Sequence, residues 1–209
     1  MEATAPTRMN LLAKKAQRLL AQQGRDLLEQ KREALLREFM RNVDLAVRDG
    51  ESLDRLAADA AYALAFAKAI DGPEAVRSAS IAALDAVSVE VDAANVMGVS
   101  VPTVRRESLP PSPLERGYSL PATTARIDDV AERFEAELDL LIELAAVETR
   151  LRRLGDEIKA TSRRVNALDN VFIPRLDEQM RRIAATLEER EREDVFRLKR
   201  VKKRLASAR

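Results

Sequence analysis

Two long segments of the chain place an apolar residue at every third or fourth position. This spacing is the period of an α-helix that buries one stripe of its surface. The first segment, roughly residues 8 to 47, follows Thr7, which is a suitable N-cap, and helix-forming residues continue beyond it to Gly72 and Pro73. The helix therefore either runs on or restarts after a short kink near Gly50. The repeated positions are Met9, Leu12, Ala16, Leu19, Leu20, Leu27, Leu28, Leu35, Phe39 and Val43.

The second segment, residues 124 to 206, keeps the helical period from about Ile127 onward for almost 80 residues. At 1.5 Å per residue, one helix of this length would span about 120 Å. Such a helix needs a partner of similar length, and the first segment is the candidate. We therefore expect a mainly α fold, a long antiparallel two-helix coiled-coil hairpin with both chain ends at one tip. A helical bundle that folds back more often is the alternative. The predicted coiled-coil core consists of Leu19, Leu27, Leu35, Phe39, Ile158, Val165, Leu168, Phe172, Leu176 and Ile183.

The middle of the chain has a different pattern. Valines alternate with small or polar residues on both sides of Met97 and Gly98, which predicts short strands around a turn. The alternating valines are Val87, Val89, Val91, Val99 and Val101. The stretch that follows holds Pro110, Pro111, Pro113, Pro121 and Gly117, so we expect an extended loop there. The expected organisation is one elongated domain over residues 1–209, with N-terminal helix or helices at 8–70, a middle region at 73–121 and a long helix at 124–206.

Pro174 interrupts the second helical segment. A proline inside a helix removes a hydrogen bond and costs roughly 3 kcal/mol, so the helix could end at Ile173. However, the apolar stripe continues through the site from Val165 to Ile183, with steps of three, four, four, four and three residues. A loop would normally reset this phase. The pattern therefore favours a continuous helix that bends at Pro174.

The composition supports long helices and narrows the possible chemistry. Charged residues make up 34% of the chain and aromatic residues 3%, as in coiled coils. Cysteine and histidine are absent, so the usual thiol nucleophile, general base and metal ligands are missing. No glycine-rich phosphate-binding pattern occurs. We expect no catalytic, cofactor or metal site, and neither a signal peptide nor a membrane span.

Basic residues gather at both ends of the chain. Residues 1 to 25 carry a net charge of +4 and residues 195 to 209 a net charge of +7, which leaves about −10 for the remainder. The basic end "RLKRVKKRLASAR" has affinity for phosphates, but Leu198, Val201 and Leu205 continue the helical stripe through it and no aromatic residues alternate with the cations. A nucleic acid and an acidic protein pocket are both compatible with this pattern.

Several motifs together resemble the D subunit of the V-type (A/V-type) rotary ATPases and ATP synthases. They are "PTRMNLL" near the start, "NVMGVSVP" and "GYSLPATTARID" in the middle, and "RRVNALDNVFIPRLDEQM" and "EREDVFRLKRVK" near the end. The resemblance touches both helical segments and the middle of the chain. It implies a non-catalytic central rotor stalk, which couples ATP synthesis or hydrolysis to proton or sodium transport by rotation. Some family members extend well past "RLKRVK", whereas this chain stops at Arg209.

The resemblance also implies partners. The A and B subunits would form a hexamer around the stalk, the small F subunit would pair with it, and the C subunit would hold its base. Membrane association, on the cytoplasmic face, would come only through this complex, with no direct nucleotide or nucleic-acid binding. Met97 and Gly98 would lie in a regulatory or contact element, or else in a structural plug. The alternative to the stalk is a free-standing coiled-coil adaptor or a basic protein that binds polyanions. The implied hexamer-binding residues are Arg8, Met9, Leu12, Lys15, Leu198, Arg200, Val201, Arg204 and Leu205.

Overall fold

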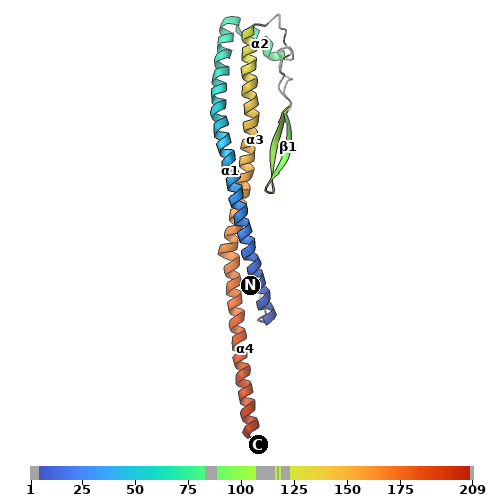
Figure 1. Cartoon of the computed structure of the whole chain (residues 1–209), viewed down its shortest axis with the longest axis vertical. Helices are drawn as coiled ribbons and strands as arrows, with labels where there is room; N and C mark the ends of the chain where they lie inside the picture. The colour runs from blue at the N-terminus through green and yellow to red at the C-terminus, as the bar shows by residue number, and fades with distance from the viewer. Residues whose placement is uncertain (1–4, 83–88, 107–115, 117, 119–122, 208–209) are drawn as a thin grey trace. The chain divides into compact units, whose positions relative to one another are not determined.

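The computed structural model describes residues 5–82, 89–106, 116, 118 and 123–207. Helices dominate, and one antiparallel pair of strands lies between them in chain order (Figure 1). This confirms the predicted mainly α fold with a β-hairpin in its middle region. The elements are α1 (Arg8–Asp71), α2 (Pro73–Ala82), β1 (Val89–Val96), β2 (Val99–Arg106), α3 (Ala125–Ala167), the π-helical turn η3 (Leu168–Phe172) and α4 (Ile173–Ser207).

The chain divides into two compact units. The first unit contains Met1–Ala34 and Lys159–Arg209, and the second contains Leu35–Ile158. The predicted single elongated domain stays a prediction. The predicted proline-rich loop lies outside the described residues, because Pro110, Pro111, Pro113, Pro121 and Gly117 are among those not described.

Helix α1 begins and ends at residues suited to those positions. At its start, the backbone N–H of Asn10 donates to Thr7 Oγ1 at 3.2 Å, so Thr7 is the N-cap. The helix continues through Gly50 without interruption. At its end, Gly72 has φ +85°, the left-handed conformation that glycine adopts readily, and Pro73 opens α2.

A seam of close helix packing follows α1 at an unbroken heptad spacing. From Leu11 to Ala67, every position in alternating steps of three and four is buried or half-buried. In the second unit this seam contains Leu35 and small residues such as Ala63 and Ala67, which pack with Val130 of α3. Such a strict 3.5-residue repeat is the signature of a coiled-coil seam.

A polar residue interrupts the apolar seam of the second unit. Asn42 is 1% exposed, and its Nδ2 donates to the Glu38 backbone carbonyl oxygen at 2.7 Å. Its Oδ1 accepts a hydrogen bond from Arg150 Nη1 of α3 at 3.2 Å. A buried asparagine in a seam fixes the register of the two helices, because a shifted register would leave its amide without partners.

Two ionic contacts hold the start of α3 in the second unit. The Arg116 guanidinium, 9% exposed, donates from Nε and Nη2 to the two Glu135 carboxylate oxygens, both at 2.7 Å. This contact raises the pKa of Arg116. Arg126 binds the Asp71 carboxylate at the end of α1, with 2.7 Å between Nη2 and Oδ1, and this hydrogen bond is the main cause that lowers the pKa of Asp71.

The β-hairpin has a two-residue turn at Met97 and Gly98. Their φ angles are +53° and +85°, the positive values that a type I′ turn requires at both positions, and Val96 pairs with Val99. The hairpin lies against α3 of the same unit, because Arg153 Nη1 donates to the Ser100 backbone oxygen at 2.7 Å. The strands match the predicted alternation, although Val87, which belonged to that pattern, lies outside the described residues.

The helix runs through Pro174 by means of a π turn. Residues 168 to 172 form η3, and the Ile173 N–H donates to the Leu168 carbonyl oxygen five residues earlier. Regular α structure resumes at Ile173, so the chain does not break there. The wider turn directly precedes the proline, where a regular α turn would clash with the ring. The bend predicted at Pro174 stays a prediction.

The structure corrects part of the predicted core. Leu19, Leu27 and Phe172 are 58%, 65% and 46% exposed. In the first unit the seam of α1 passes instead through smaller or polar positions such as Ala21. The other members of the predicted core are either buried (Leu35, Val165, Leu176 and Ile183) or half-buried (Phe39, Ile158 and Leu168).

Candidate docking surface

Ion pairs join the two helices of the first unit. Arg18 of α1 contacts Asp177 of α4, with 2.6 Å between Nε and Oδ1. Arg25, seven residues further along α1, contacts Asp169 in the π turn, with 3.5 Å between Nη1 and Oδ1. Because Arg18 and Arg25 occupy seam positions, their charged groups take space that leucines fill in a regular coiled coil. Several large apolar residues of this part of α1, among them Leu19, Leu20 and Leu27, therefore lie outside the seam and are exposed.

These apolar residues form an exposed row along α1. Met9 and Leu12 are 76% and 61% exposed, and the row continues through Leu19, Leu20 and Leu27. A soluble helix normally turns such a stripe towards its core. Large exposed apolar patches mark interaction sites, and this row on one helix is a candidate for such a site.

The end of α4 has no helical neighbour within the described part of the first unit. Arg8, the first residue of α1, forms an ion pair with Glu191. From Glu188 to Ala206 every residue is exposed, and α4 continues past the beginning of α1 (Figure 1). Ser207 lies 16 residues beyond Glu191, a distance of about 24 Å along the helix. The expectation that both basic runs meet at one tip is therefore corrected. The start of α1 lies beside Glu191, and α4 continues beyond this point to Ser207.

This free end of α4 is both apolar and cationic. Leu198, Val201 and Leu205 are 68%, 54% and 66% exposed, at the spacing of one helical stripe. Six cations lie between residues 197 and 204, and no acidic residue occurs there. One of them, Lys199, has its Nζ 5.8 Å from the centre of the Phe196 ring. A helical segment of this length is only marginally stable in water when nothing packs against it. A partner that encloses it would therefore stabilise it.

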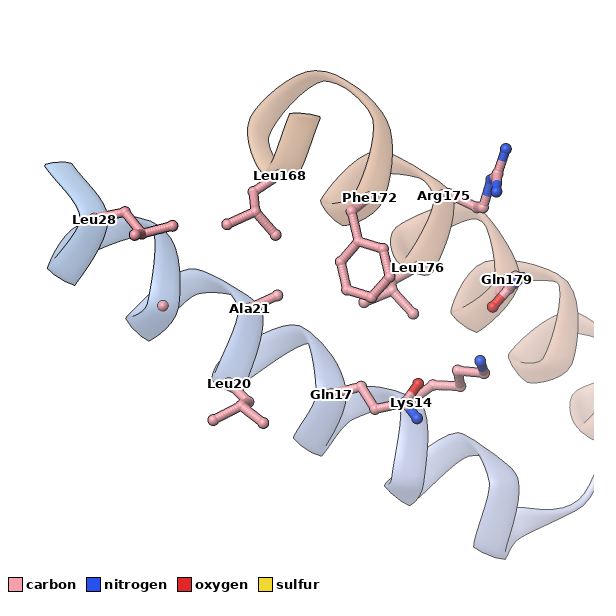
Figure 2. A pocket seen from close by; sticks show the side chains of 11 residues that line it. Lys14, Gln17, Leu20, Ala21, Leu28, Leu168, Phe172, Arg175, Leu176 and Gln179 are labelled. Carbon is pink, nitrogen blue, oxygen red and sulfur yellow. The ribbon is translucent and has the colours of Figure 1, made fainter. Parts of the chain in front are cut away.

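A groove of about 510 Å³ opens between α1 and the π turn in the first unit. Leu168, Phe172 and Leu176 point towards α1, and Ala21 and Leu28 of α1 face them (Figure 2). Lys14 and Gln17 lie at the end of the groove near Gln179. The floor is closed, since Ala21 and Leu176 are 8% and 3% exposed. A second groove, lined by residues that include Lys15, Arg18 and Met180, lies on the other flank of the seam.

Comparison with known proteins identifies the family. A model of the family described as the D subunit of ATP synthase matches residues 10–203. The chain belongs to the ATP synthase D-subunit family. The V-type ATP synthase D subunit of Thermus thermophilus is 44% identical over 202 residues, which cover 97% of this chain and 89% of the relative. The A-type ATP synthase D subunits of Thermococcus kodakarensis and Pyrococcus furiosus are 44% and 41% identical over 197 residues, covering 94% of this chain and 92% of each relative.

The family match spans almost all of the candidate surface. It begins two residues after Arg8 and ends one residue before Arg204, so the row on α1 from Leu12 onward and most of the free end of α4 lie within it. Among the residues that the structure describes, no helix is long and apolar enough to cross a membrane. Within those same residues, no group of three or more acidic side chains is placed to hold a metal ion.

The structure places the implied hexamer-binding residues on two elements of the first unit. Those from the N-terminal run lie in the first two turns of α1, and those from the C-terminal run lie on the free end of α4. Sequence reasoning missed the exposed part of this surface formed by Leu19, Leu20 and Leu27, because large apolar residues at helical spacing were assigned to the core. The implied residues that are exposed are Arg8, Met9, Leu12, Lys15, Leu198, Arg200, Val201, Arg204 and Leu205.

Proposed function

We propose that this chain is the non-catalytic central stalk of a V-type rotary ATPase or ATP synthase, with the first unit seated inside a hexamer of A and B subunits. The observation that carries the proposal is the free end of α4, which combines an exposed apolar stripe with cations. An apolar helix end in water favours burial in a partner, and its charge favours a partner lined by carboxylates. The F and C subunits would bind the stalk elsewhere, and the complex would lie on the cytoplasmic face of the membrane.

In this role the chain breaks no bonds. A shaft whose sides differ contacts the three catalytic interfaces differently, so its angle changes the relative stability of their open and closed states. Nucleotide turnover, by favouring one state at each interface, in turn drives the shaft to a new angle. The ion pairs and the apolar seam between α1 and α4 resist relative movement of the two helices, which a shaft under torque requires.

The composition of the complex tests the role directly. The tagged chain is purified gently from membranes of its native host, and the bound subunits are identified and counted by mass spectrometry. We expect three copies each of the A and B subunits per copy of this chain. Recovery of nucleic acid or unrelated proteins without ATPase subunits would overturn the proposal and favour the polyanion-binding alternative.

A variant of the free end separates apolar recognition from charge. Replacing Leu198, Val201 and Leu205 together by Gln keeps every cation of α4. If a ring of subunits encloses this end, the triple variant binds the hexamer more weakly, whereas polyanion binding depends on the cations and would not change. Unchanged hexamer binding by the triple variant would contradict an enclosed apolar tip.

Coupling is tested by a pair of acidic substitutions at the π turn. Leu168→Asp together with Phe172→Asp places carboxylates between α1 and α4, and we expect ATP turnover to continue while ion transport in reconstituted vesicles falls. Val171→Asp is the matched control, because Val171 is 54% exposed and does not line the groove. Full coupling in the double variant would count against a stiff two-helix shaft.

A further inference from the structure

Two of the α1 residues that line the groove beside the π turn are small. Ala21 and Gly24 are three residues apart, and both lie on the side of α1 that faces Leu168 and Leu176. A Cβ atom placed on Gly24 would meet no atom within 4 Å, so the space above this residue is empty. At this level the two helices leave a hollow that neither of them fills.

Gly24 has no explanation within the described part of the chain. Its φ is in the ordinary range, and no described side chain needs the room that the missing Cβ leaves. A glycine inside a helix is about 0.5–1 kcal/mol less stable than alanine. Glycine is one residue that lets a ligand approach the backbone closely. Gly24 differs from Gly50, where a Cβ also meets nothing within 4 Å, because Gly24 lines a groove.

The charge on the rim defines the chemistry of the occupant. Lys14 and Arg175 line the groove, and no acidic residue is among its described lining residues. Within the described part of the chain, no ion pair joins either cation to a carboxylate. Arg175 lies at the outer edge, and its guanidinium points away from α1 (Figure 2). The walls present apolar side chains to the groove, because Leu20 and Phe172 line it and are 69% and 46% exposed.

We propose that this groove seats an apolar side chain from an acidic segment of one member of the surrounding hexamer. The apolar side chain lies over Gly24 between Leu20 and Phe172, and flanking carboxylates of the same segment pair with Lys14 and Arg175. The identity of the partner rests on the proposed stalk function, whereas the chemistry of the occupant rests on the lining of the groove.

The groove distinguishes one flank of the shaft from the other. The second groove, on the opposite flank, has no aromatic residue and no π turn among its described lining residues. An acidic segment that fits the first groove therefore fits only one angular position of the stalk relative to that partner. Leu168 and Phe172, the first and last residues of the π turn, both line the first groove.

The proposal is tested by filling the groove. In Gly24→Leu, the side chain enters empty space, and leucine is a better helix former than glycine. We expect the melting temperature of the free chain to be unchanged or raised, while binding to a reconstituted ring of A and B subunits weakens at least tenfold. Gly50→Leu is the matched control, because a Cβ on Gly50 also meets nothing within 4 Å and Gly50 lines no described groove. It should gain the same stability and bind the ring like the parent chain.

Further variants keep the test valid if Gly24→Leu disturbs the fold. Lys14→Glu and Arg175→Glu reverse the rim charge without filling the groove, and each should weaken ring binding by about tenfold at low salt and less at high salt. In addition, Gly24→Cys introduces the single thiol of this cysteine-free chain, which should react with a maleimide in the free protein and be protected in the complex.

The outcomes separate the two proposals. If the parent chain binds the ring but Gly24→Leu, Lys14→Glu and Arg175→Glu bind equally well, the groove is not the seat and the stalk function stands. If the thiol of Gly24→Cys reacts equally fast in the complex, the groove proposal is also overturned. If the parent chain does not bind the ring at all, the stalk function itself fails, and the assignment of the partner fails with it.

Discussion

The distinction between the seam and the exposed row of α1 can be tested by two leucine-to-alanine variants of the first unit. Leu176 is 3% exposed and lies in the seam, whereas Leu27 is 65% exposed and lies in the exposed row. Both are leucines on long helices at apolar positions of the sequence pattern. Their substitutions nevertheless remove very different amounts of buried surface.

The expected costs follow from the burial. Truncating a buried leucine to alanine costs about 2–5 kcal/mol, because transfer free energy is lost and a cavity remains. Complete burial of a leucine side chain contributes about 1.5–3 kcal/mol, so Leu27, roughly one-third covered, contributes about 0.5–1 kcal/mol. In a chain of this size, 1 kcal/mol shifts the melting temperature by roughly 2–4 °C. We expect a decrease of about 4–8 °C or more for Leu176→Ala and at most about 2–4 °C for Leu27→Ala.

The assay should report on the first unit alone, because a single melting curve averages over two compact units. Hydrogen exchange measured by mass spectrometry on peptides from residues 8–34 and 159–191 gives the free energy of local opening there. Leu176→Ala should lower this free energy by at least about 1 kcal/mol more than Leu27→Ala. Equal losses would show that Leu27 belongs to the core and would refute the assignment of the exposed row.

In the assembled complex, we expect Leu27→Ala to weaken binding to the ring, although it has little effect on the stability of the free chain. If a member of the ring buries the exposed two-thirds of Leu27, truncation removes up to about 1–2 kcal/mol of binding free energy, which corresponds to roughly a 5- to 30-fold weaker affinity. The measurement is the dissociation constant for the ring at physiological salt. Leu27→Ala with unchanged affinity would leave the row without a partner at that position.

Other predictions concern the second unit. Arg116→Met should lower the free energy of unfolding by about 2–3 kcal/mol in urea titrations, because it leaves the Glu135 carboxylate without its partner, and a double-mutant cycle with Glu135→Gln should show coupling. The lowered pKa of Asp71 means that its contact with Arg126 stabilises the fold above the carboxyl's unfolded pKa and is lost as the pH falls through the folded value. Asp71→Asn should therefore reduce the loss of stability in acid. The measurement is the melting temperature between about pH 6 and pH 2, the range in which carboxylates titrate. Met97→Asn should stabilise the β-hairpin by up to about 1 kcal/mol, because Asn–Gly suits a type I′ turn better, and should slow proteolysis of the hairpin.

The helical fold was predictable because its signal is long and periodic. The apolar repeat predicts two long helices whatever the choice of stripe, and alternating valines around Met97 and Gly98 predict the β-hairpin. The choice of the buried stripe was harder. In the first part of α1, leucine doublets such as Leu19–Leu20 and Leu27–Leu28 allow more than one stripe. The correct one is found by continuing the heptad backwards from Leu35, through positions whose side chains are mostly small or charged.

The π turn also left a signal in the sequence. Alternating steps of three and four describe a regular coiled coil, but Leu168, Phe172, Leu176 and Met180 are separated by three consecutive steps of four. The stripe therefore contains one residue more than the heptad allows, and a π turn accommodates one extra residue without breaking the helix. The groove could not be predicted in this way, because its existence depends on which helix faces Gly24 and at what register.

The two compact units of the chain carry net charges of opposite sign. The first unit carries 22 basic and 12 acidic residues, a net charge of +10, whereas the second carries 14 basic and 23 acidic residues, a net charge of −9. The overall charge of +1 conceals this division. Partners that are complementary to one unit are repelled by the other, so opposite charges add specificity to contacts that exposed apolar side chains strengthen. The division explains why a basic end alone is a poor guide to function: the cations of α4 would attract any polyanion, and it is the uncharged row of Leu198, Val201 and Leu205 among them that favours an enclosing protein.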